Sequence, residues 1–284
     1  MSEYVEIFEV GPRDGLQNES RHIPTEDKIA LINCLSQAGF RRIEVASFVS
    51  PKWVPQMADS GAVLQGITRA EGVSYAALTP NMRGFEAAVQ ANADEIAIFG
   101  SASEGFSKAN INASIAESLA RFAPINEARR TAGLAMRGYV SCVVECPYDG
   151  PTDPAQVAKV AKSLLDMGCY EISLGDTLGR ATPEAVAAML DSVLEVVPAP
   201  QLAGHFHDTA GRAMANIEAS LAKGLRVFDA AVGGLGGCPY APGAAGNVAT
   251  ETVEAGLRAW GYHTGLDPEV LQQAGSLAKA MRAG

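Results

Sequence analysis

The sequence has few histidines and cysteines and no excess of basic residues. Its 5 cysteines are an odd number without a CxxC pair, so we expect no disulfide framework and a reducing, cytoplasmic setting. Lysine and arginine together number 22, against 32 aspartates and glutamates. Because phosphate backbones are bound by clustered basic side chains, this balance argues against a nucleic-acid partner.

The sequence also lacks several segments and motifs that would indicate other classes of protein. No run of about 18 apolar residues is present, so no membrane-spanning helix is expected, and the first residues lack the pattern of a signal peptide. No GxGxxG motif follows the first predicted strand, which argues against a dinucleotide-binding fold. No linker-like or low-complexity tract divides the chain, which predicts one catalytic domain over residues 1–284.

One junction recurs along the chain: a helical pattern ends at a glycine, and a β-rich segment begins a few residues later. Glycine takes the left-handed conformation that ends a helix without strain. The junction occurs at Gly39, Gly72, Gly133, Gly168 and Gly224. Together with segments 5–10, 94–99 and 201–205, these junctions give eight predicted strands separated by helical patterns.

This alternation predicts an α/β protein with a (β/α)8 TIM barrel, whose C-terminal extension closes over the barrel mouth. An open, doubly wound sheet is the alternative. Capping residues support the helix starts, because Asp153 precedes Pro154 and Thr182 precedes Pro183. In such a barrel, polar residues just after the strands lie at the catalytic end.

Two of the four histidines lie in the segment His205-Phe-His207, at the end of the seventh predicted strand. Residues two apart on a strand point to the same face, which is a metal-ligand spacing. Asp14, after the first strand, is the natural third ligand because strands 1, 8 and 7 are neighbours in a closed barrel, and Asn247 offers a carbonyl oxygen. This mixed set favours Mg²⁺ or Mn²⁺. The alternative is a pair of histidines that only form structural hydrogen bonds.

Three charged residues near these positions suggest catalytic roles. Arg13, beside Asp14, can stabilise an enolate or oxyanion. Asp176, after the sixth strand, is a candidate general base, and Glu44 is a candidate to orient Arg13 or the substrate. Structural ion pairs are the alternative for each of them.

The segment 233–247 is rich in glycine and predicts an active-site loop over the barrel mouth. Phosphate cradling is the second use, but no lysine follows in the pattern of a phosphate-binding loop. Cys238 lies in this segment, where its thiol can relay a proton or be oxidised.

Several long strings of residues resemble the 3-hydroxy-3-methylglutaryl-CoA lyase family. They are Val10-Gly-Pro-Arg-Asp-Gly-Leu-Gln-Asn-Glu19, Glu44-Val-Ala-Ser-Phe-Val-Ser-Pro-Lys-Trp-Val-Pro-Gln56, Ile172-Ser-Leu-Gly-Asp-Thr177, His205-Phe-His-Asp-Thr209 and Gly234-Leu-Gly-Gly-Cys-Pro-Tyr240. The resemblance extends from about residue 4 past Asp267.

The resemblance implies a metal-dependent carbon–carbon lyase that cleaves 3-hydroxy-3-methylglutaryl-CoA to acetyl-CoA and acetoacetate, as in leucine degradation and ketone-body formation. It implies an acyl-CoA substrate and no nicotinamide, flavin or pyridoxal phosphate. The implied metal ligands are Asp14, His205, His207 and Asn247, with Glu251 supporting them. Arg13 would stabilise the enolate, Asp176 with His205 would move the hydroxyl proton, and Cys238 would return a proton to carbon. Gln17, Glu44, Ser47 and Thr177 would contact the substrate.

Glu145, Ala210 and Pro242 depart from the family pattern, which usually has glycine, tyrosine and a longer polar residue there. A reshaped acyl pocket for a longer or different 3-hydroxyacyl-CoA is therefore an alternative, beside neutral drift. An acyl-CoA aldol synthase and a barrel that has lost catalysis are further alternatives. A homodimer is expected from the habits of such barrels, without a sequence feature that requires it.

Overall fold

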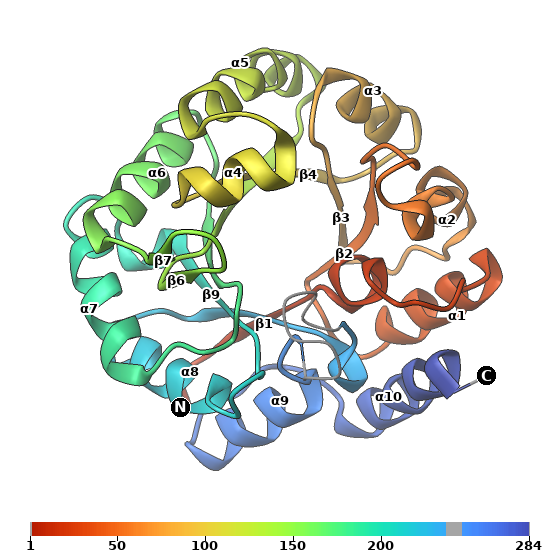
Figure 1. The fold of residues 1–284 in the computed structure, drawn as a ribbon. Coiled ribbons are helices and arrows are strands. Elements are labelled where there is room, and N and C mark those ends of the chain that lie inside the picture. The colour runs from red at the N-terminus through yellow and green to blue at the C-terminus, as the bar shows by residue number, and fades with distance from the viewer. Residues whose placement is uncertain (1, 237–245, 284) are drawn as a thin grey trace.

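The structure, a computed structural model, describes residues 2–236 and 246–283, which form a closed barrel of parallel strands inside a ring of helices (Figure 1). The eight barrel strands are β1 (Glu6–Glu9), β2 (Arg42–Ser47), β3 (Ser74–Leu78), β4 (Glu95–Ser101), β5 (Ala135–Ser141), β8 (Ile172–Asp176), β9 (Leu202–Phe206) and β10 (Val227–Ala230). Their order around the barrel is β1-β10-β9-β8-β5-β4-β3-β2. The predicted (β/α)8 barrel is confirmed.

Except for α4, which lies over one end of the barrel, the helices cover the outside of the strands (Figure 1). They are α1 (Thr25–Leu35), α2 (Ser60–Gly66), α3 (Met82–Gln90), α4 (Glu104–Ile111), α5 (Ile115–Ala132), α6 (Pro154–Asp166), α7 (Pro183–Leu194), α8 (Ala213–Ala222), α9 (Thr250–Ala259) and α10 (Pro268–Ala283). No helix in the described part of the chain is long and apolar enough to cross a membrane.

The predicted helix ends are confirmed at Gly133, Gly168 and Gly224, which lie one or two residues after the ends of α5, α6 and α8. The prediction is wrong at Gly39 and Gly72, because α1 already ends at Leu35 and α2 at Gly66. All five junction glycines have positive φ angles, from 71° at Gly133 to 101° at Gly168. At Gly39 a Cβ atom would also lie 2.5 Å from the backbone oxygen of Gly265, so the close approach of two loops adds to the need for glycine. Asp153 and Thr182 cap α6 and α7 by accepting hydrogen bonds from the amides of Ala155 and Ala185.

The main apolar core lies between the strands and the helices, where one large cluster of buried side chains runs around the barrel. The inside of the barrel is different, because four charged residues from β2, β5, β10 and the start of β8 fill much of it. Arg42, Arg137, Glu171 and Asp229 are joined there by ion pairs of 2.7 to 3.0 Å. We call these four residues the charged column.

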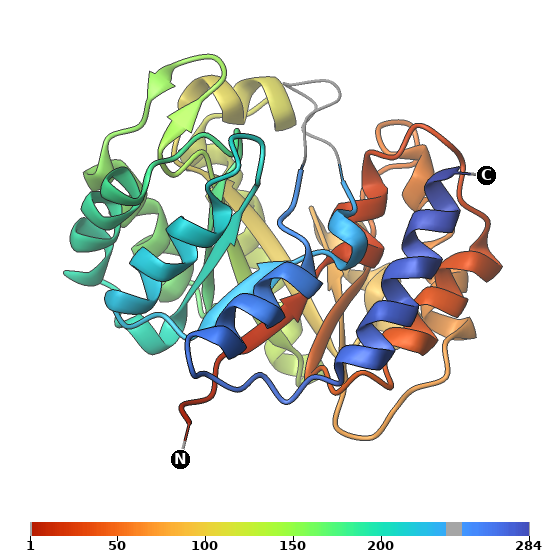
Figure 2. The same ribbon diagram turned by 90° about the horizontal axis from the view of Figure 1, so that it is seen from below.

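The carboxyl ends of the strands form the barrel mouth. Helix α4 and the short hairpin of β6 (Glu145–Cys146) and β7 (Gly150–Pro151) lie over this end, and the N-terminus lies at the opposite end (Figures 1 and 2). Short helical turns also join the elements, at η1 (Gly11–Gly15), η2 (Pro55–Met57), η3 (Ala199–Gln201) and η4 (Val232–Gly234).

The C-terminal extension does not close over the mouth as the sequence predicted. Helix α10 lies in the outer ring, where it packs against α1, α9 and η4 (Figures 1 and 2). Its buried residues Leu271, Ala274 and Ala278 belong to the main apolar core. The helix therefore completes the outer ring between α9 and α1, because its apolar face is buried against them there.

Candidate active site

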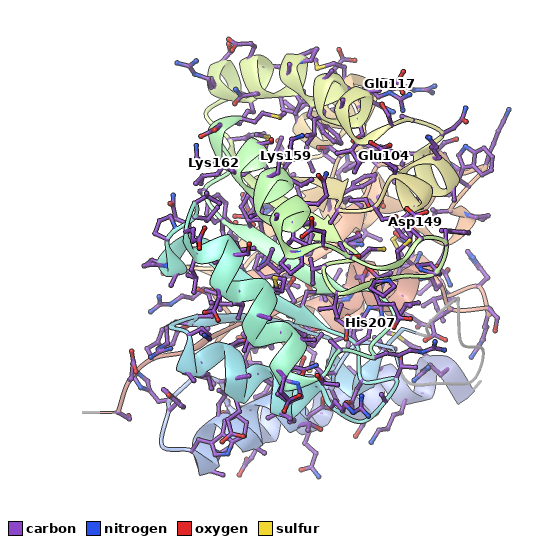
Figure 3. The ribbon with its side chains drawn as sticks, turned by 60° about the vertical axis from the view of Figure 1, so that its left-hand side comes forward. Glu104, Glu117, Asp149, Lys159, Lys162 and His207 are labelled. Atoms are coloured by element: carbon purple, nitrogen blue, oxygen red, sulfur yellow. The ribbon has the colours of Figure 1, made fainter. Side chains whose placement is uncertain are left out.

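Arg13 and Asp14 lie on η1, a single wide helical turn that directly follows β1. Because β1 pairs with β10, and β10 pairs with β9, this turn lies near the end of β9 that carries His205 and His207. The predicted convergence of Asp14 with the two histidines is therefore present. Figure 3 shows His207 at the same end of the barrel as Glu104 on α4 and Asp149 of the hairpin.

The side chains of Asp14, His205 and His207 form a cluster with the composition of a metal site. One potential ligand atom from each lies within 4.8 Å of the other two. Nε2 of His205 is 3.9 Å from Oδ2 of Asp14, and the two imidazole centroids are 5.4 Å apart. Nδ1 of His207 is buried and has no hydrogen-bond partner among the described residues. A buried nitrogen without a partner beside a carboxylate fits a divalent cation.

Asn247 reaches the cluster because its segment returns to the end of β9. Residue 247 bridges His207 in antiparallel fashion, and the amide of Val248 donates to the carbonyl of Phe206 at 3.2 Å. The side-chain amide of Asn247 donates to Oδ2 of Asp14 at 2.8 Å. A rotation of that amide would present its oxygen in place of its nitrogen, so the residue fits the predicted ligand set.

The charges around the cluster keep it suited to a cation. Burial alone would raise the pKa of Asp14, but Arg13 and the two histidines lower it to about 2. Burial, followed by the neighbouring His205, lowers the pKa of His207 to about 4. Asp14 is therefore charged and His207 neutral near pH 7, which are the forms that bind metal ions.

Arg13 is fixed between two carboxylates. Its guanidinium donates to Oδ1 of Asp14 at 2.7 Å and also pairs with Glu44, whose side chain is fully buried. Tyr139 lies on the other side, with its ring centroid 5.5 Å from Cζ of Arg13. Glu44 thus orients Arg13, one of the two uses expected from the sequence.

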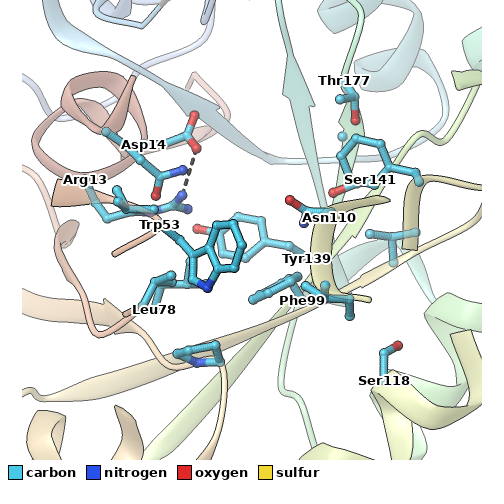
Figure 4. Close-up of a pocket in the computed structure, with 18 of the residues that line it drawn as sticks. Arg13, Asp14, Trp53, Leu78, Phe99, Asn110, Ser118, Tyr139, Ser141 and Thr177 are labelled. Carbon is cyan, nitrogen blue, oxygen red and sulfur yellow. Dashed lines mark hydrogen bonds and ion pairs between the residues drawn. The ribbon is translucent and has the colours of Figure 1, made fainter. Parts of the chain in front are cut away.

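A cavity of about 820 Å³ opens beside the cluster. Of the predicted site residues, seven line it: Arg13, Asp14, Gln17, Thr177, His205, His207 and Asn247. The cavity then continues away from Arg13 and Asp14 past Phe99 to Ser118 (Figure 4). The end beside the cluster is polar and charged, and the other end combines aromatic side chains, such as Phe99 and Phe122, with polar ones that include Asn110 and Arg121.

Asp176 is the last residue of β8, at the strand end that the sequence predicted, but its side chain does not line the cavity. Its Oδ2 accepts a hydrogen bond from the amide of Ala181 at 3.0 Å, and its side chain is not part of the cavity lining that Gly175 and Thr177 contribute. Successive strand residues point to opposite faces, so Asp176 points away when its neighbours face the cavity. Burial raises its pKa, and backbone amides of the turn at 179–181 lower it. Its observed contacts hold that turn rather than a substrate.

Three further predicted residues are outside the cavity lining. Glu44 contacts Arg13 instead, and Ser47 is buried with its hydroxyl oxygen lacking a partner among the described residues. Glu251 accepts hydrogen bonds from the amide of Gly233, at 3.2 and 3.0 Å, and so supports η4. Among the described residues, no hydrogen bond joins Glu251 to a predicted metal ligand.

The departures from the family pattern do not reshape the main cavity in the described part of the chain. Glu145 lies in the β6–β7 hairpin beside a separate, smaller hollow, and Ala210 is exposed. Neither residue lines the main cavity, which favours neutral drift over a reshaped acyl pocket. Cys238, Pro242 and most of the predicted loop 233–247 lie outside the described residues.

The sequence reasoning missed Tyr139, Arg137 and Asp229. Tyr139 lines the cavity, and its hydroxyl is buried without a partner in the described structure. Asp229 accepts a hydrogen bond from Nδ1 of His205 at 3.1 Å and is paired with Arg137. The available signal was a charged residue inside an otherwise apolar strand, which is costly unless the charge is paired.

Comparison with known proteins gives a consistent result. Residues 4–278 match the family model described as HMGL-like. The chain is 57% identical over 271 residues to the 3-hydroxy-3-isohexenylglutaryl-CoA/hydroxy-methylglutaryl-CoA lyase of Pseudomonas aeruginosa, covering 95% of this chain and 90% of the relative. It is 58% identical over 272 residues to the mitochondrial hydroxymethylglutaryl-CoA lyase of Bos taurus, covering 96% and 84%. The crystal structure of the HMG-CoA lyase from Brucella melitensis superimposes with a TM-score of 0.99 at 63% identity, covering 100% of both chains.

Proposed function

Because the chain belongs to the HMGL-like family and is an enzyme of the lyase type, we propose that it cleaves 3-hydroxy-3-methylglutaryl-CoA to acetyl-CoA and acetoacetate. The observation that carries this proposal is the cluster of Asp14, His205 and His207 next to Arg13 at the wall of one cavity. The reaction breaks the bond between C2 and C3 after the C3 hydroxyl loses its proton, and negative charge then develops on the thioester oxygen.

Asp14, His205, His207 and Asn247 are the proposed ligands of a divalent ion, Mg²⁺ or Mn²⁺. When bound, such an ion would supply a Lewis acid that holds substrate oxygens and favours transfer of the hydroxyl proton to a water molecule in the cavity. We assign His205 to this role rather than to proton transfer. Its Nδ1 contacts Asp229 and its Nε2, which faces Asp14, would hold the ion, so neither ring nitrogen would remain for a proton from the substrate.

Arg13 is the proposed stabiliser of the enolate. Its guanidinium is held by Glu44 and Asp14 and lines the cavity, so it is positioned before charge develops on the thioester oxygen. The hydroxyl of Tyr139 is a second donor that lines the same space. Cys238 is proposed to return a proton to the enolate carbon, and Gln17 and Thr177 to contact the acyl group.

A second candidate substrate is a 3-hydroxyglutaryl-CoA with a longer alkyl group at C3. The arm of the cavity that runs past Phe99 and Phe122, whose ring centroids are 6.0 Å apart, has an apolar wall that offers room for such a group. The Pseudomonas aeruginosa relative carries the isohexenyl substrate in its name. To test this, Ser118→Leu would fill the far end of the arm. The kcat/KM for the isohexenyl substrate, divided by that for the methyl substrate, should fall in this variant. An unchanged ratio would exclude the arm as the binding site of the longer alkyl group.

The main proposal is tested with protein stripped of metal by EDTA and then given Mn²⁺ or Mg²⁺. We expect HMG-CoA cleavage to be lost in the stripped protein and restored by either ion. Asp14→Asn should remain inactive at the same ion concentration, whereas Asp59→Asn, which changes a carboxylate between α1 and α2, should retain activity. Full cleavage by the stripped protein in the presence of EDTA would contradict the metal assignment.

The predicted homodimer and cytoplasmic location stay predictions. Light scattering of the purified protein, over a range of concentrations, measures the mass directly and tests the dimer.

A further inference from the structure

The charged column ends at one of the proposed metal ligands. Asp229 on β10 and His205 on β9 are register partners in neighbouring strands. Oδ2 of Asp229 lies 3.1 Å from Nδ1 of His205, on the ring edge opposite the nitrogen that faces Asp14. The two nitrogens of this imidazole therefore have different surroundings, a carboxylate at Nδ1 and the ligand cluster at Nε2.

The carboxylate of Asp229 is held from several sides. Arg137 donates to both of its oxygens, at 2.7 Å to Oδ1 and 3.1 Å to Oδ2, and Ser173 donates to Oδ2 at 2.7 Å. Asp229 is 2% exposed and Arg137 is fully buried. With these donors in place, the carboxylate has no room to rotate away from His205, and Arg137 offsets the cost of burying its charge.

The far end of the column holds Arg137 in turn. Its Nε donates to Oε1 of Glu171 at 2.7 Å, and Glu171 also pairs with Arg42 at 3.0 Å. The charges therefore alternate in sign from Arg42 through Glu171 and Arg137 to Asp229. The inside of such a barrel is commonly filled by apolar side chains. Here the charged column lies inside the barrel instead, and it holds the side chain of His205 at the mouth.

We propose that Asp229, held by Arg137 and Ser173, is a positioning residue that fixes His205 as the Nδ1–H tautomer with a free lone pair on Nε2. The inference rests on the proposed role of His205 as a metal ligand. A hydrogen bond at one imidazole nitrogen determines which nitrogen is left to bind a metal. An amide in place of the Asp229 carboxylate can present its NH₂ group to Nδ1, which then has to accept and leaves the hydrogen on Nε2.

The tautomer can be measured without any metal. The chain has only four histidines, so selective ¹⁵N labelling gives a readable set of ring signals, and the His205→Gln variant assigns those of His205. At alkaline pH, where the ring is neutral, we expect the hydrogen of His205 on Nδ1 in the wild type. In Asp229→Asn, the share of molecules with the hydrogen on Nε2 should rise.

Calorimetric titration with Mn²⁺ is the second measurement. Asp229→Asn should weaken Mn²⁺ binding by about 10–100-fold, the usual effect of losing a partner behind a metal ligand. Ser173→Ala, which removes one donor and leaves the ion pair intact, should weaken it a few-fold. The matched control is Asp59→Asn, which removes a carboxylate from the buried Lys28 outside the barrel and should leave both measurements unchanged.

The inference is overturned if the wild type carries the hydrogen on Nε2, or if Asp229→Asn keeps both the wild-type tautomer and Mn²⁺ affinity. Should Asp229→Asn fail to fold, Ser173→Ala decides, because wild-type values for both quantities in that variant would also overturn it. Absence of Mn²⁺ binding in the wild type would refute the proposed metal site instead, and the tautomer measurement would still decide the role of Asp229.

Discussion

Replacing Arg13 by methionine should damage stability and catalysis for separate reasons. Glu44 is fully buried, and among the described residues its Oε2 contacts Arg13 while its Oε1 has no hydrogen-bond partner. Without Arg13, a charged Glu44 would be buried without the cation that pairs with it directly, and only the Coulomb attraction of Arg137 would remain. Breaking a buried pair in this way costs about 3–5 kcal/mol, a large part of the ~5–15 kcal/mol that stabilises a typical protein.

The pH dependence identifies Glu44 as the cause. Burial raises the pKa of Glu44, and Arg13 lowers it, so the pKa rises further in Arg13→Met. When the pKa of a carboxyl group is higher in the folded than in the unfolded state, the free energy of unfolding of the protein falls as the pH rises toward the folded-state pKa. The free energy lost in Arg13→Met should therefore be larger at pH 8 than at pH 5.

Urea unfolding followed by circular dichroism measures these free energies, and Glu44→Gln supplies the second half of a double-mutant cycle. The double variant Arg13→Met/Glu44→Gln should recover most of the lost stability and none of the lost kcat, because the guanidinium is still absent. An Arg13→Met protein as stable as the wild type at pH 8, or a double variant no more stable than the single one, would refute this reasoning.

Other predictions follow from individual contacts. Asp14→Asn should weaken Mn²⁺ binding by at least about tenfold in calorimetry, since the only carboxylate of the cluster is lost; wild-type affinity would exclude it as a ligand. Asp176→Asn should keep wild-type Mn²⁺ affinity and lose about 1–3 kcal/mol of unfolding free energy, because its carboxylate accepts from the turn at 179–181. Burial raises the pKa of Glu9 to about 8, so its contribution to stability is full below the unfolded pKa and is lost as pH rises to about 8. Glu9→Gln should remove this decline, of up to ~1.4 kcal/mol per pH unit, from urea unfolding curves.

The barrel and the core of the ligand cluster were predictable from the sequence because each rests on a local rule. A glycine ends a helix at its positive φ, and the spacing of His205 and His207 places both rings on one face of β9. Barrel closure then brings the end of β1 near that of β9, so Asp14 could be placed without knowing any side-chain contact.

The direction of Asp176 could not be predicted in the same way. Strands of a parallel barrel are buried on both faces, so their residues form continuous apolar runs without the alternation that would show which side chains face inward. A shift of one residue exchanges the two faces, and here Gly175 and Thr177 face the cavity instead.

The position of α10 and the role of Asp229 depend on long-range packing. The sequence of α10 shows an apolar face, but it does not show that this face packs between α9 and α1. Likewise, the pairing of Asp229 with Arg137 joins residues 92 positions apart. The sequence shows only that each is a charge inside an apolar strand.

Cleavage of HMG-CoA carrying ¹³C in the methyl group at C3, followed by NMR, tests the central claim most directly. Breaking the C2–C3 bond leaves that methyl carbon in acetoacetate. With Mn²⁺ present, we predict that all of the label appears in acetoacetate, in an amount equal to the unlabelled acetyl-CoA released. Label that stays in HMG-CoA with folded, Mn²⁺-loaded protein, or that appears in acetyl-CoA, would contradict the proposed reaction.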